Sequence, residues 1–338
     1  MISIIITTFN NWELTYNCIE SVKKFTNDYE IIVADDCSIE ENTDILNDVK
    51  IVRTEKNLGY LLNCNNAVKE AKGDIIILLN NDTLVTEGWS EWILKTFEDK
   101  SVGIVGGKLI NPQGLLCCGG AIFFQDGLII NYGRGLNPFL HEFNYLKEVD
   151  GVTGACFAIR RELWEKCNGF DERYAPAYCE DSDLCMQIRL LGFKVIYQPN
   201  CIITHCEGRT YQVKAIELIK INRQKFYQKW QLVLLTHSPQ NDLFHARDRS
   251  YGKRTHLLSA EYTKDKECTI IANIKRFQKL GLCIKFLIKI PNNVVNLQMP
   301  RNAFINILGQ MGVECIDERY LSVFKKFIDN TIQLEFFN

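Results

Sequence analysis

The stretch Ile2-Ser3-Ile4-Ile5-Ile6-Thr7-Thr8 opens the chain with a run of mostly β-branched residues that ends in two threonines. A continuous run of this kind is typical of a strand that is buried on both faces, as in a parallel sheet. The segment from Trp12 to Phe25 then carries apolar residues at helical spacing, and Glu30-Ile31-Ile32-Val33-Ala34 repeats the strand pattern. The beginning of the chain therefore predicts a strand–helix–strand unit of an α/β protein.

The same alternation continues further along the chain. Strands are expected at Ile51–Arg53 and Asp74–Leu79, with a helix from about Leu62 to Ala71 between them. Shorter, glycine-rich strands are expected over 102–160, followed by a helix from Glu180 to Leu191. This order predicts a doubly wound, mostly parallel sheet, and such sheets bind ligands outside the carboxyl ends of their strands.

The composition is that of an ordinary globular protein, since 46% of the 338 residues are hydrophobic and 24% are charged. The formal net charge of -2 gives no general electrostatic reason to bind nucleic acid. The first residues lack the pattern of an export signal, so we expect a cytoplasmic protein whose 14 cysteines are mostly buried thiols. No apolar run reaches the roughly 18 residues of a membrane-spanning helix, so we expect no such segment.

The length suggests two domains, or one large domain with an appendage. We expect an α/β domain over 1–211, a helical extension and linker over 212–254, and a small or truncated α/β segment over 255–338. Within the last segment we expect a helix over 270–280, a strand over 283–288 and a helix over 303–311.

The extension carries an amphipathic pattern over 213–235, where Asn222, Phe226 and Trp230 recur at four-residue steps. This spacing predicts a helix with one face turned to the protein interior. Packing against the main domain is its expected role, and peripheral contact with a membrane is the alternative.

Polar residues stand where three of the predicted strands end: Thr7-Thr8, Asp35-Asp36 and Asn80-Asn81-Asp82. Because parallel strands end at one edge of a sheet, we expect these residues to line a common site. A nucleotide diphosphate needs a divalent cation, which one or two protein carboxylates hold together with the phosphates, and Asp82 meets that requirement. Asp36 can accept a hydrogen bond from a pyrimidine base or a ribose. Turn formation and helix capping are the alternative roles of these residues.

Two later segments carry further candidate groups. Glu180-Asp181 begins a helix whose dipole favours an ionised carboxylate, which suits a base that removes the proton of an attacking hydroxyl. Helix capping is the alternative role. His205 follows a closing strand expected at Lys194–Tyr197, and its imidazole is either a second metal ligand or an ordinary strand-end histidine.

In this order, the segments resemble the family 2 glycosyltransferases of the GT-A fold, over residues 1 to about 210. The first half of the match consists of Ser3–Asn10, similar to the family's opening strand, Asp35-Asp36-Cys37-Ser38, similar to its Asp-Asp-x-Ser segment, and Asn57-Leu58-Gly59, similar to its Asn-x-Gly turn. Asn80-Asn81-Asp82 stands where the family carries Asp-x-Asp, with asparagine at two positions. The second half consists of Gly154-Ala155-Cys156, similar to a small-residue segment, Glu180-Asp181, similar to the Glu-Asp motif, and His205, similar to a late histidine.

The resemblance implies a GT-A fold with a C-terminal helical and partial α/β extension. It implies an inverting glycosyltransferase that moves a sugar from a UDP- or dTDP-sugar to a hydroxyl acceptor, in surface polysaccharide or glycoconjugate synthesis. The implied partners are the donor and a saccharide, lipid-linked saccharide or protein acceptor, without nucleic acid. The implied location is the cytoplasm, with peripheral attachment to the inner membrane face as the alternative.

The resemblance also implies a role for each site residue. The donor nucleotide is expected against Thr7, Thr8, Phe9, Asp35, Asp36, Asn57, Gly59, Asn80 and Asn81, with Asp36 on the base. Asp82 and His205 are the implied ligands of Mn²⁺ or Mg²⁺. Asp181, with Glu180 beside it, is the implied catalytic base, and Gly154, Ala155 and Cys156 lie on the acceptor side.

The tail carries a weaker likeness. Arg247-Asp248-Arg249 and 253–258 resemble the junction before a second glycosyltransferase domain in some two-domain relatives. Lys279-Leu280-Gly281 and Met311-Gly312-Val313-Glu314 are similar to the first turns of a GT-B-type half.

Two other functions are alternatives to sugar transfer. A sugar-1-phosphate nucleotidyltransferase needs a glycine-rich, basic phosphate loop after the first strand, and the segment Thr7–Trp12 contains neither glycine nor lysine. A catalytically inactive nucleotide-sugar-binding module stays open, because Asn80 and Asn81 replace acids.

Overall fold

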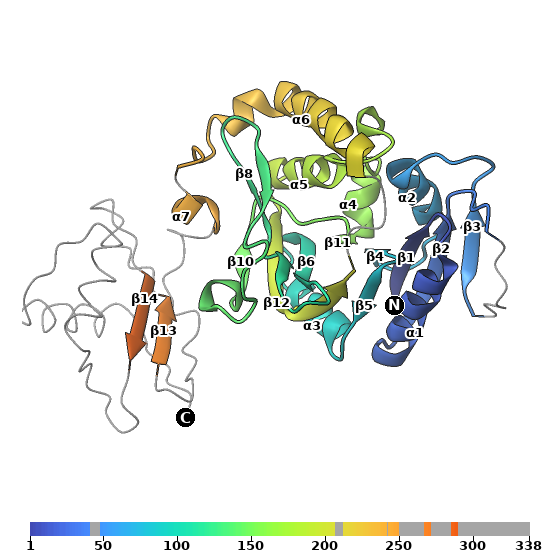
Figure 1. Cartoon of the computed structure of the whole chain (residues 1–338), viewed down its shortest axis with the longest axis horizontal. Helices are drawn as coiled ribbons and strands as arrows, with labels where there is room; N and C mark the ends of the chain where they lie inside the picture. Colours follow the sequence, from blue (N-terminus) through green and yellow to red (C-terminus); the bar gives the residue numbers. More distant parts are fainter. Residues whose placement is uncertain (41–47, 207–211, 242, 250–266, 272–284, 290–338) are drawn as a thin grey trace, which may run out of the picture. The chain divides into compact units, whose positions relative to one another are not determined.

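A computed structural model describes residues 1–40, 48–206, 212–241 and 243–249, together with two strands at 267–271 and 285–289. The chain divides into two units, Met1–Arg249 and Ser250–Asn338. Every site residue named above lies in the first unit, whose elements are labelled in Figure 1.

A ten-stranded sheet forms the centre of the first unit, in the order β10-β12-β6-β11-β4-β1-β2-β3, with β5 paired to β12 and β7 to β6. Its strands are β1 (Ile2–Thr8), β2 (Tyr29–Asp35), β3 (Lys50–Arg53), β4 (Ile75–Asn80), β5 (Thr83–Val85), β6 (Val102–Ile110), β7 (Leu116–Cys118), β10 (Lys147–Glu148), β11 (Cys156–Arg160) and β12 (Lys194–His205). The helices are α1 (Trp12–Phe25), α2 (Tyr60–Val68), α3 (Trp89–Phe97), α4 (Arg161–Lys166), α5 (Glu180–Leu190), α6 (Gln212–Leu234) and α7 (Leu243–Ala246). A hairpin of β8 (Ala121–Phe123) and β9 (Ile129–Asn131) and the 3-10 helices η1 (His141–Phe143) and η2 (Glu172–Tyr174) complete the unit.

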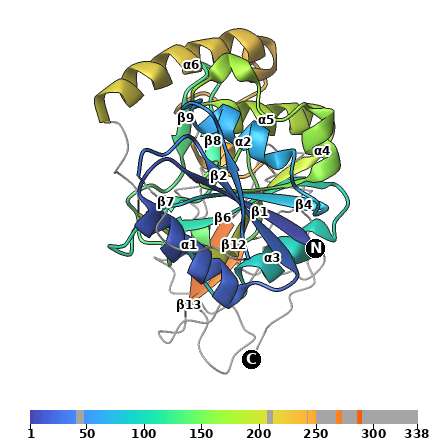
Figure 2. The same cartoon turned by 90° about the vertical axis from the view of Figure 1, so that its right-hand side faces the viewer.

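The opening strand lies at the centre of the parallel part of the sheet. β1 pairs in parallel with β2 and β4, and all seven of its residues are buried. Because successive side chains point to opposite faces, Ile4 and Ile6 join the core on the α1 and α3 side, whereas Ile5 joins the core on the α2 side. Figures 1 and 2 show α2, α4 and α5 on the face opposite α1 and α3. The expected α/β fold with a mostly parallel central sheet is confirmed.

An antiparallel strand joins the two halves of the sheet. β11 lies between β4 and β6 and runs antiparallel to both. The residues just before β11 are therefore placed beside the carboxyl end of β4, where the backbone N–H of Asn80 donates to the carbonyl oxygen of Ala155 at 3.3 Å. The acceptor-side segment and the Asn80-Asn81-Asp82 triplet thus meet at one edge.

The closing strand is longer than the sequence indicates. Pro199 and Asn200 favour a break after the expected strand at 194–197, but β12 continues to His205 through a register shift between Gln198 and Ile202. Its last residues pair antiparallel with β5, with His205 opposite Thr83. Strand pairing, which the local sequence does not reveal, carries His205 to the triplet.

The helix expected over 213–235 forms as α6 and packs on the first unit. Phe226, Trp230 and Leu234 belong to the same core cluster as α2, α4 and α5. Figure 1 shows α6 lying along α5. Within the described ranges, no helix combines the length and apolar character needed to cross a membrane.

Two short strands are described in the second unit, β13 (Glu267–Ile271) and β14 (Lys285–Lys289), which pair antiparallel. The helix expected from Ile270 is wrong at its start, because Ile270 and Ile271 end β13; strand pairing of a β-branched run outweighs the helical spacing. The strand expected over 283–288 corresponds to β14. The junction at 253–258, the helix at 303–311 and the turn motifs at 279–281 and 311–314 lie outside the described residues, and the division of the chain at 211 and 254 stays a prediction.

Candidate active site

The end of β1 is fixed by a network of hydroxyl and amide groups. The Thr15 hydroxyl of α1 donates to the Thr8 hydroxyl at 2.8 Å, and Asn81 Nδ2 donates to the Oγ1 atoms of Thr8 and Thr15 at 3.3 and 3.1 Å. Thr7 pairs with Asn80 across the sheet, and Phe9 is half-buried directly after the strand. Asn81 therefore turns toward β1 and α1 and joins two of the predicted strand ends.

The two acids at the end of β2 have different surroundings. Asp35, which is 1% exposed, forms an ion pair with Arg53, and one of its oxygens accepts hydrogen bonds from the Ser38 backbone and hydroxyl. Asp36 instead points toward the turn that precedes α2. Its carboxylate accepts from the backbone N–H groups of Leu58 at 2.7 Å and Gly59 at 2.8 Å. Asp36 thus holds the turn beside which the donor nucleotide is expected.

The Asn57-Leu58-Gly59 turn requires glycine at its last position. Gly59 has a φ of 84°, and a Cβ atom there would lie 2.3 Å from the Cβ of Pro176. The exposed Asn57 donates from Nδ2 to the Asp36 carbonyl oxygen at 3.4 Å. The turn therefore lies against both the β2 end and the segment that leads to Glu180-Asp181.

Asp82 and His205 form the candidate metal pair. His205 Nε2 lies 3.2 Å from Asp82 Oδ1, and the side chains are 10% and 18% exposed, respectively. The Cys206 N–H donates to the Asp82 carbonyl oxygen at 2.8 Å, which fixes the two segments together. Neighbouring ligands of an octahedral cation with bonds of about 2.1 Å are roughly 3 Å apart, so this spacing fits a shared divalent ion.

Asn80, two residues before Asp82 in the triplet, carries a further candidate oxygen. Its Oδ1 is buried and has no hydrogen-bond partner, as is expected of an oxygen that faces a ligand, ion or water. Across the described part of the chain, no three His, Cys, Asp or Glu residues gather as a metal cluster. A cation here would therefore take its other ligands from the donor phosphates and water, as Mg²⁺ commonly does.

Asp181 stands opposite the triplet across a short bridge. Its Oδ2 accepts from the Gly154 backbone N–H at 3.0 Å, while the carbonyl oxygen of the next residue, Ala155, accepts from Asn80. Cys156 then begins β11 and pairs with Leu79. Two consecutive residues thus contact the candidate base on one side and the metal-side strand on the other.

The pKa values of both acids at the start of α5 are raised. Burial raises the pKa of Asp181 above its usual value, although the side chain keeps partial exposure to solvent. The pKa of Glu180 is raised well above its usual value, first by burial and then by the charge of Asp181. Glu180 is 5% exposed and its Oε2 has no hydrogen-bond partner. Perturbed carboxyl groups beside a ligand-binding edge are typical of catalytic sites.

Sequence patterns do not reveal two residues that complete this geometry. The Tyr60 hydroxyl donates to the Gly154 carbonyl oxygen at 3.0 Å, so Tyr60 and Asp181 contact the two sides of one glycine. The Pro176 carbonyl oxygen accepts from the Leu61 N–H at 3.1 Å, which joins α2 to the segment before α5. Both contacts link residues about a hundred positions apart, and no local spacing signals them.

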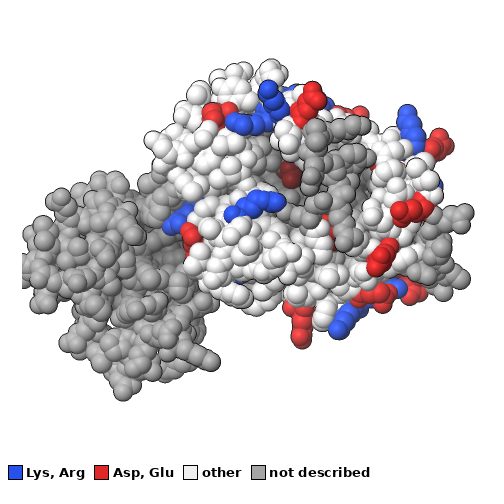
Figure 3. All heavy atoms as spheres, viewed as in Figure 1, with Lys and Arg blue, Asp and Glu red and all other residues white. Residues whose placement is uncertain are grey.

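Figure 3 shows the charged side chains on one face of the first unit. On the face drawn in Figure 3, basic and acidic side chains are interspersed on the described surface, in agreement with the net charge of -2. The expectation from the net charge, that the chain does not bind nucleic acid, stays a prediction.

The fold and the order of these motifs define a class of enzyme. Residues 3–167 match the family model described as "Glycosyl transferase family 2". This part of the chain is therefore similar to the family 2 glycosyltransferases, as the strand-end motifs predicted.

Curated relatives match only parts of this chain and smaller parts of themselves. The chain is 27% identical over 247 residues to "Uncharacterized protein y4gI" of Sinorhizobium fredii, covering 68% of this chain and 27% of that protein. It is 29% identical over 159 residues to "O-antigen biosynthesis protein RfbC" of Myxococcus xanthus, covering 45% of this chain and 12% of that protein. It is 35% identical over 128 residues to "Poly(ribitol-phosphate) beta-glucosyltransferase" of Bacillus spizizenii, covering 34% of this chain and 20% of that protein. The matches thus span about a quarter or less of these relatives.

Two solved structures share the fold. GalNAc-T7, crystallised with UDP, GalNAc and Mn²⁺, is 16% identical with a TM-score of 0.54, covering 80% of this chain and 62% of that one. Mannosyltransferase PcManGT of Pyrobaculum calidifontis, in complex with GDP-Man and Mn²⁺, is 16% identical with a TM-score of 0.51, covering 69% and 67%. At these identities the likeness establishes the fold alone, which is the GT-A fold.

Proposed function

We propose that this glycosyltransferase moves a sugar from a pyrimidine nucleotide diphosphate to an acceptor hydroxyl, with inversion at the anomeric carbon. The observation that carries the proposal is the convergence of three groups at one sheet edge. These groups are the turn held by Asp36, the Asp82–His205 pair, and Asp181 across the Gly154-Ala155 bridge. Both structural neighbours were crystallised with a nucleotide and Mn²⁺, which supports a metal-dependent nucleotide-sugar donor, and the UDP of GalNAc-T7 is a pyrimidine nucleotide.

The donor half of the site is assigned to β1, β2 and β4. The base and ribose would lie against Thr7, Thr8, Phe9 and the Asp36-bound turn, with the diphosphate toward Asp82 and His205. Mn²⁺ or Mg²⁺, held by Asp82 and His205, would neutralise the charge that develops on the departing diphosphate. The buried Asn80 Oδ1, which has no hydrogen-bond partner, would supply a neutral oxygen in place of an acid.

The acceptor half of the site is assigned to Asp181. Its carboxylate would take the proton from the acceptor hydroxyl while that oxygen bonds to the anomeric carbon. The bond from this carbon to the diphosphate oxygen breaks on the opposite face, and the electron pair leaves with the nucleotide diphosphate. The Gly154 N–H orients one oxygen of Asp181, and the Ser182 N–H orients the other at 2.6 Å.

The biological setting follows from the relatives and stays a proposal. One relative bears an O-antigen biosynthesis name and another a poly(ribitol-phosphate) glucosyltransferase name, which favours surface polysaccharide or glycoconjugate synthesis. A saccharide, lipid-linked saccharide or protein would be the acceptor and a UDP- or dTDP-sugar the donor. Because the donor is a nucleotide, we place the reaction in the cytoplasm, with attachment to the inner membrane face as the alternative. We also propose that 255–338 belongs to a second glycosyltransferase domain.

A panel assay of nucleotide-sugar hydrolysis tests the proposed function. UDP- and dTDP-sugars are incubated with the wild-type protein and Asp181→Asn, with Mn²⁺ or with EDTA. We expect metal-dependent turnover of at least one donor by the wild type and its loss in the variant. Donor binding without turnover in either protein would instead support the inactive binding module, which Asn80 and Asn81 keep open. Retained configuration in the product, assigned by NMR, would contradict the inverting mechanism.

A further inference from the structure

A polar residue lies at the centre of the buried face of α6. Asn222 is 0% exposed, on a face that otherwise buries Phe226, Trp230 and Leu234. A buried amide is costly unless it is hydrogen-bonded; Asn222 Oδ1 has no hydrogen-bond partner, whereas Nδ2 has several. Its Nδ2 group donates to the carbonyl oxygens of Tyr174 at 2.7 Å, Ala177 at 2.8 Å and Tyr178 at 3.2 Å.

These three carbonyls belong to the segment 174–178, which leads directly into Glu180-Asp181. The segment links η2 to α5 and has no regular hydrogen-bonding pattern of its own, so the Asn222 amide supplies donors that a strand or helix would otherwise provide. The same segment contacts the donor turn, because the Pro176 carbonyl oxygen accepts from Leu61 N and Pro176 packs against Gly59. One short segment therefore contacts the donor side, the candidate base and α6.

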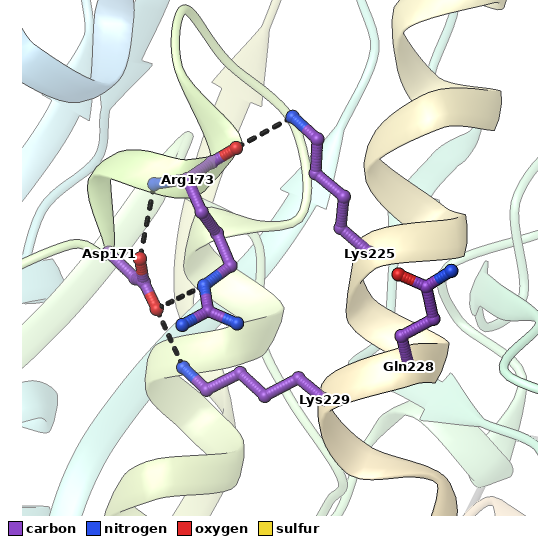
Figure 4. A pocket seen from close by; sticks show the side chains of 5 residues that line it. All are labelled: Asp171, Arg173, Lys225, Gln228 and Lys229. Carbon is purple, nitrogen blue, oxygen red and sulfur yellow. Dashed lines mark hydrogen bonds and ion pairs between the residues drawn. The ribbon is translucent and has the colours of Figure 1, made fainter.

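Further contacts clamp α6 to the same region. Asp183, one turn into α5 and fully buried, accepts from Trp230 Nε1 at 2.7 Å and from Lys229 Nζ at 2.8 Å. Figure 4 shows the outer rim of this contact, where Lys225 Nζ donates to the Arg173 carbonyl oxygen at 2.7 Å. Lys229 also reaches Asp171 at 2.8 Å there. The helix α6 is thus fixed to residues on both sides of the segment 174–178, and Asn222 bonds the segment itself.

We propose that Asn222 is a positioning residue of the transfer reaction, which acts by fixing the segment 174–178 between the donor turn and Asp181. The inference rests on the proposed role of Asp181 as the base. Among the described residues, the side-chain hydrogen bonds of Asn222 go to backbone carbonyls, so we expect it to act through the geometry of Asp181. Catalysis by an oriented base is sensitive to displacements of about 1 Å, which can change the rate by roughly 100-fold.

A graded series of variants tests this role. Asn222→Ala removes all donors to the three carbonyls, Asn222→Ser keeps one hydroxyl donor, and Phe226→Leu removes volume from the same face one turn further on. We expect Asn222→Ala to lower kcat for Mn²⁺-dependent hydrolysis of the donor found in the panel by at least about 10-fold. The KM for donor should change less than kcat, and Asn222→Ser should be intermediate. Phe226→Leu should keep kcat within about 2-fold at a temperature where it is folded, although core truncation lowers its Tm.

Hydrogen exchange gives a second measurement that does not depend on activity. In Asn222→Ala we expect faster exchange in peptides covering 174–183 than in Phe226→Leu, with α1 and β1 peptides unchanged in both. Equal exchange of 174–183 in the two variants overturns the proposal. So does a kcat of Asn222→Ala that equals the kcat of Phe226→Leu. If the wild type turns over no donor, the proposed function fails, and the exchange comparison still decides whether Asn222 fixes the segment.

Discussion

The two sides of this active site are built in different ways. On the proposed donor side, Thr8 ends β1, and Asp36 and Asp82 follow β2 and β4 within two residues, so each strand delivers a side chain directly to the sheet edge. On the acceptor side, Asp181 begins a helix and is positioned by Gly154, which lies 27 residues earlier in the chain. The first side is encoded locally. The second depends on packing between distant segments, so we expect it to respond more strongly to substitutions outside the site.

The largest expected effect comes from the acceptor side. Asp181→Asn keeps the shape of the side chain but cannot accept the acceptor proton, so we expect kcat to fall by roughly 100- to 10,000-fold with little change in donor KM. Asp99→Asn is the matched control, because Asp99 is a partly exposed carboxylate paired with Lys194 on the surface. Steady-state kinetics of both variants gives kcat and the donor KM. An Asp181 variant with wild-type kcat would remove this residue from catalysis.

The metal pair should give the next largest effect. Asp82→Ala removes one of the two proposed ligands, so we expect donor affinity in the presence of Mn²⁺ to fall by about 10- to 100-fold and to approach the affinity measured in EDTA. Asp74→Asn is the control, since Asp74 precedes the same strand at its other end and is exposed. Calorimetry of donor binding with and without Mn²⁺ measures this effect in Asp82→Ala and in the control. Unchanged affinity in both conditions would exclude Asp82 from the site.

A smaller effect is expected at the donor turn. Asp36→Asn loses charge-assisted hydrogen bonds from Leu58 and Gly59, each of which contributes about 1.5–3 kcal/mol when an ionised acceptor is involved. We expect donor KM to rise by about 10-fold and kcat to change less, because we propose that the turn binds the donor and not the acceptor. Asp28→Asn, at the exposed start of the same strand, should leave both unchanged. A fall in kcat without a change in KM would place Asp36 elsewhere in the reaction.

The pH dependence of activity should also reflect the acceptor side. Burial raises the pKa of Asp181, and a base must be deprotonated, so kcat should fall as the pH is lowered through this raised value. The acidic limb of the profile should therefore lie above the value of about 3.9 for a free aspartate. A profile that stays flat down to pH 4 would contradict this assignment.

The smallest expected effect concerns stability at Glu180. Because its pKa is raised in the folded protein, the stabilisation from its protonated form is complete below the unfolded value of about 4.3 and is lost as pH rises through the folded pKa. Glu180→Gln cannot ionise, so its free energy of unfolding should vary less with pH and should exceed that of the wild type at high pH by about 1 kcal/mol or more. Urea unfolding at a series of pH values measures this. Parallel curves for the two proteins would show that Glu180 does not titrate in this way.

Much of the fold could be predicted because its signals are local. The β-branched run at Ile2–Thr8 and the helical spacing from Trp12 to Phe25 appear in the structure as β1 and α1 with nearly the same bounds. The true end of β12 could not be predicted, since Pro199 and Asn200 favour a break that a register shift accommodates. The wrong helix at Ile270 has a related cause, because strand pairing overrides short-range periodicity.

The candidate site likewise combines features that the sequence predicts with contacts that only the structure shows. The sequence alone determined which strand ends carry acids and amides, because in a parallel α/β sheet the position of a residue after its strand fixes the edge at which it lies. Only the tertiary structure decided that Asp35 turns to Arg53 while Asp36 holds the Leu58-Gly59 turn. It also decided that His205 reaches Asp82 and that Asn222 holds the segment before Asp181. These contacts join segments that are far apart in the chain, and they depend on strand register and helix packing, which no local pattern of residues encodes.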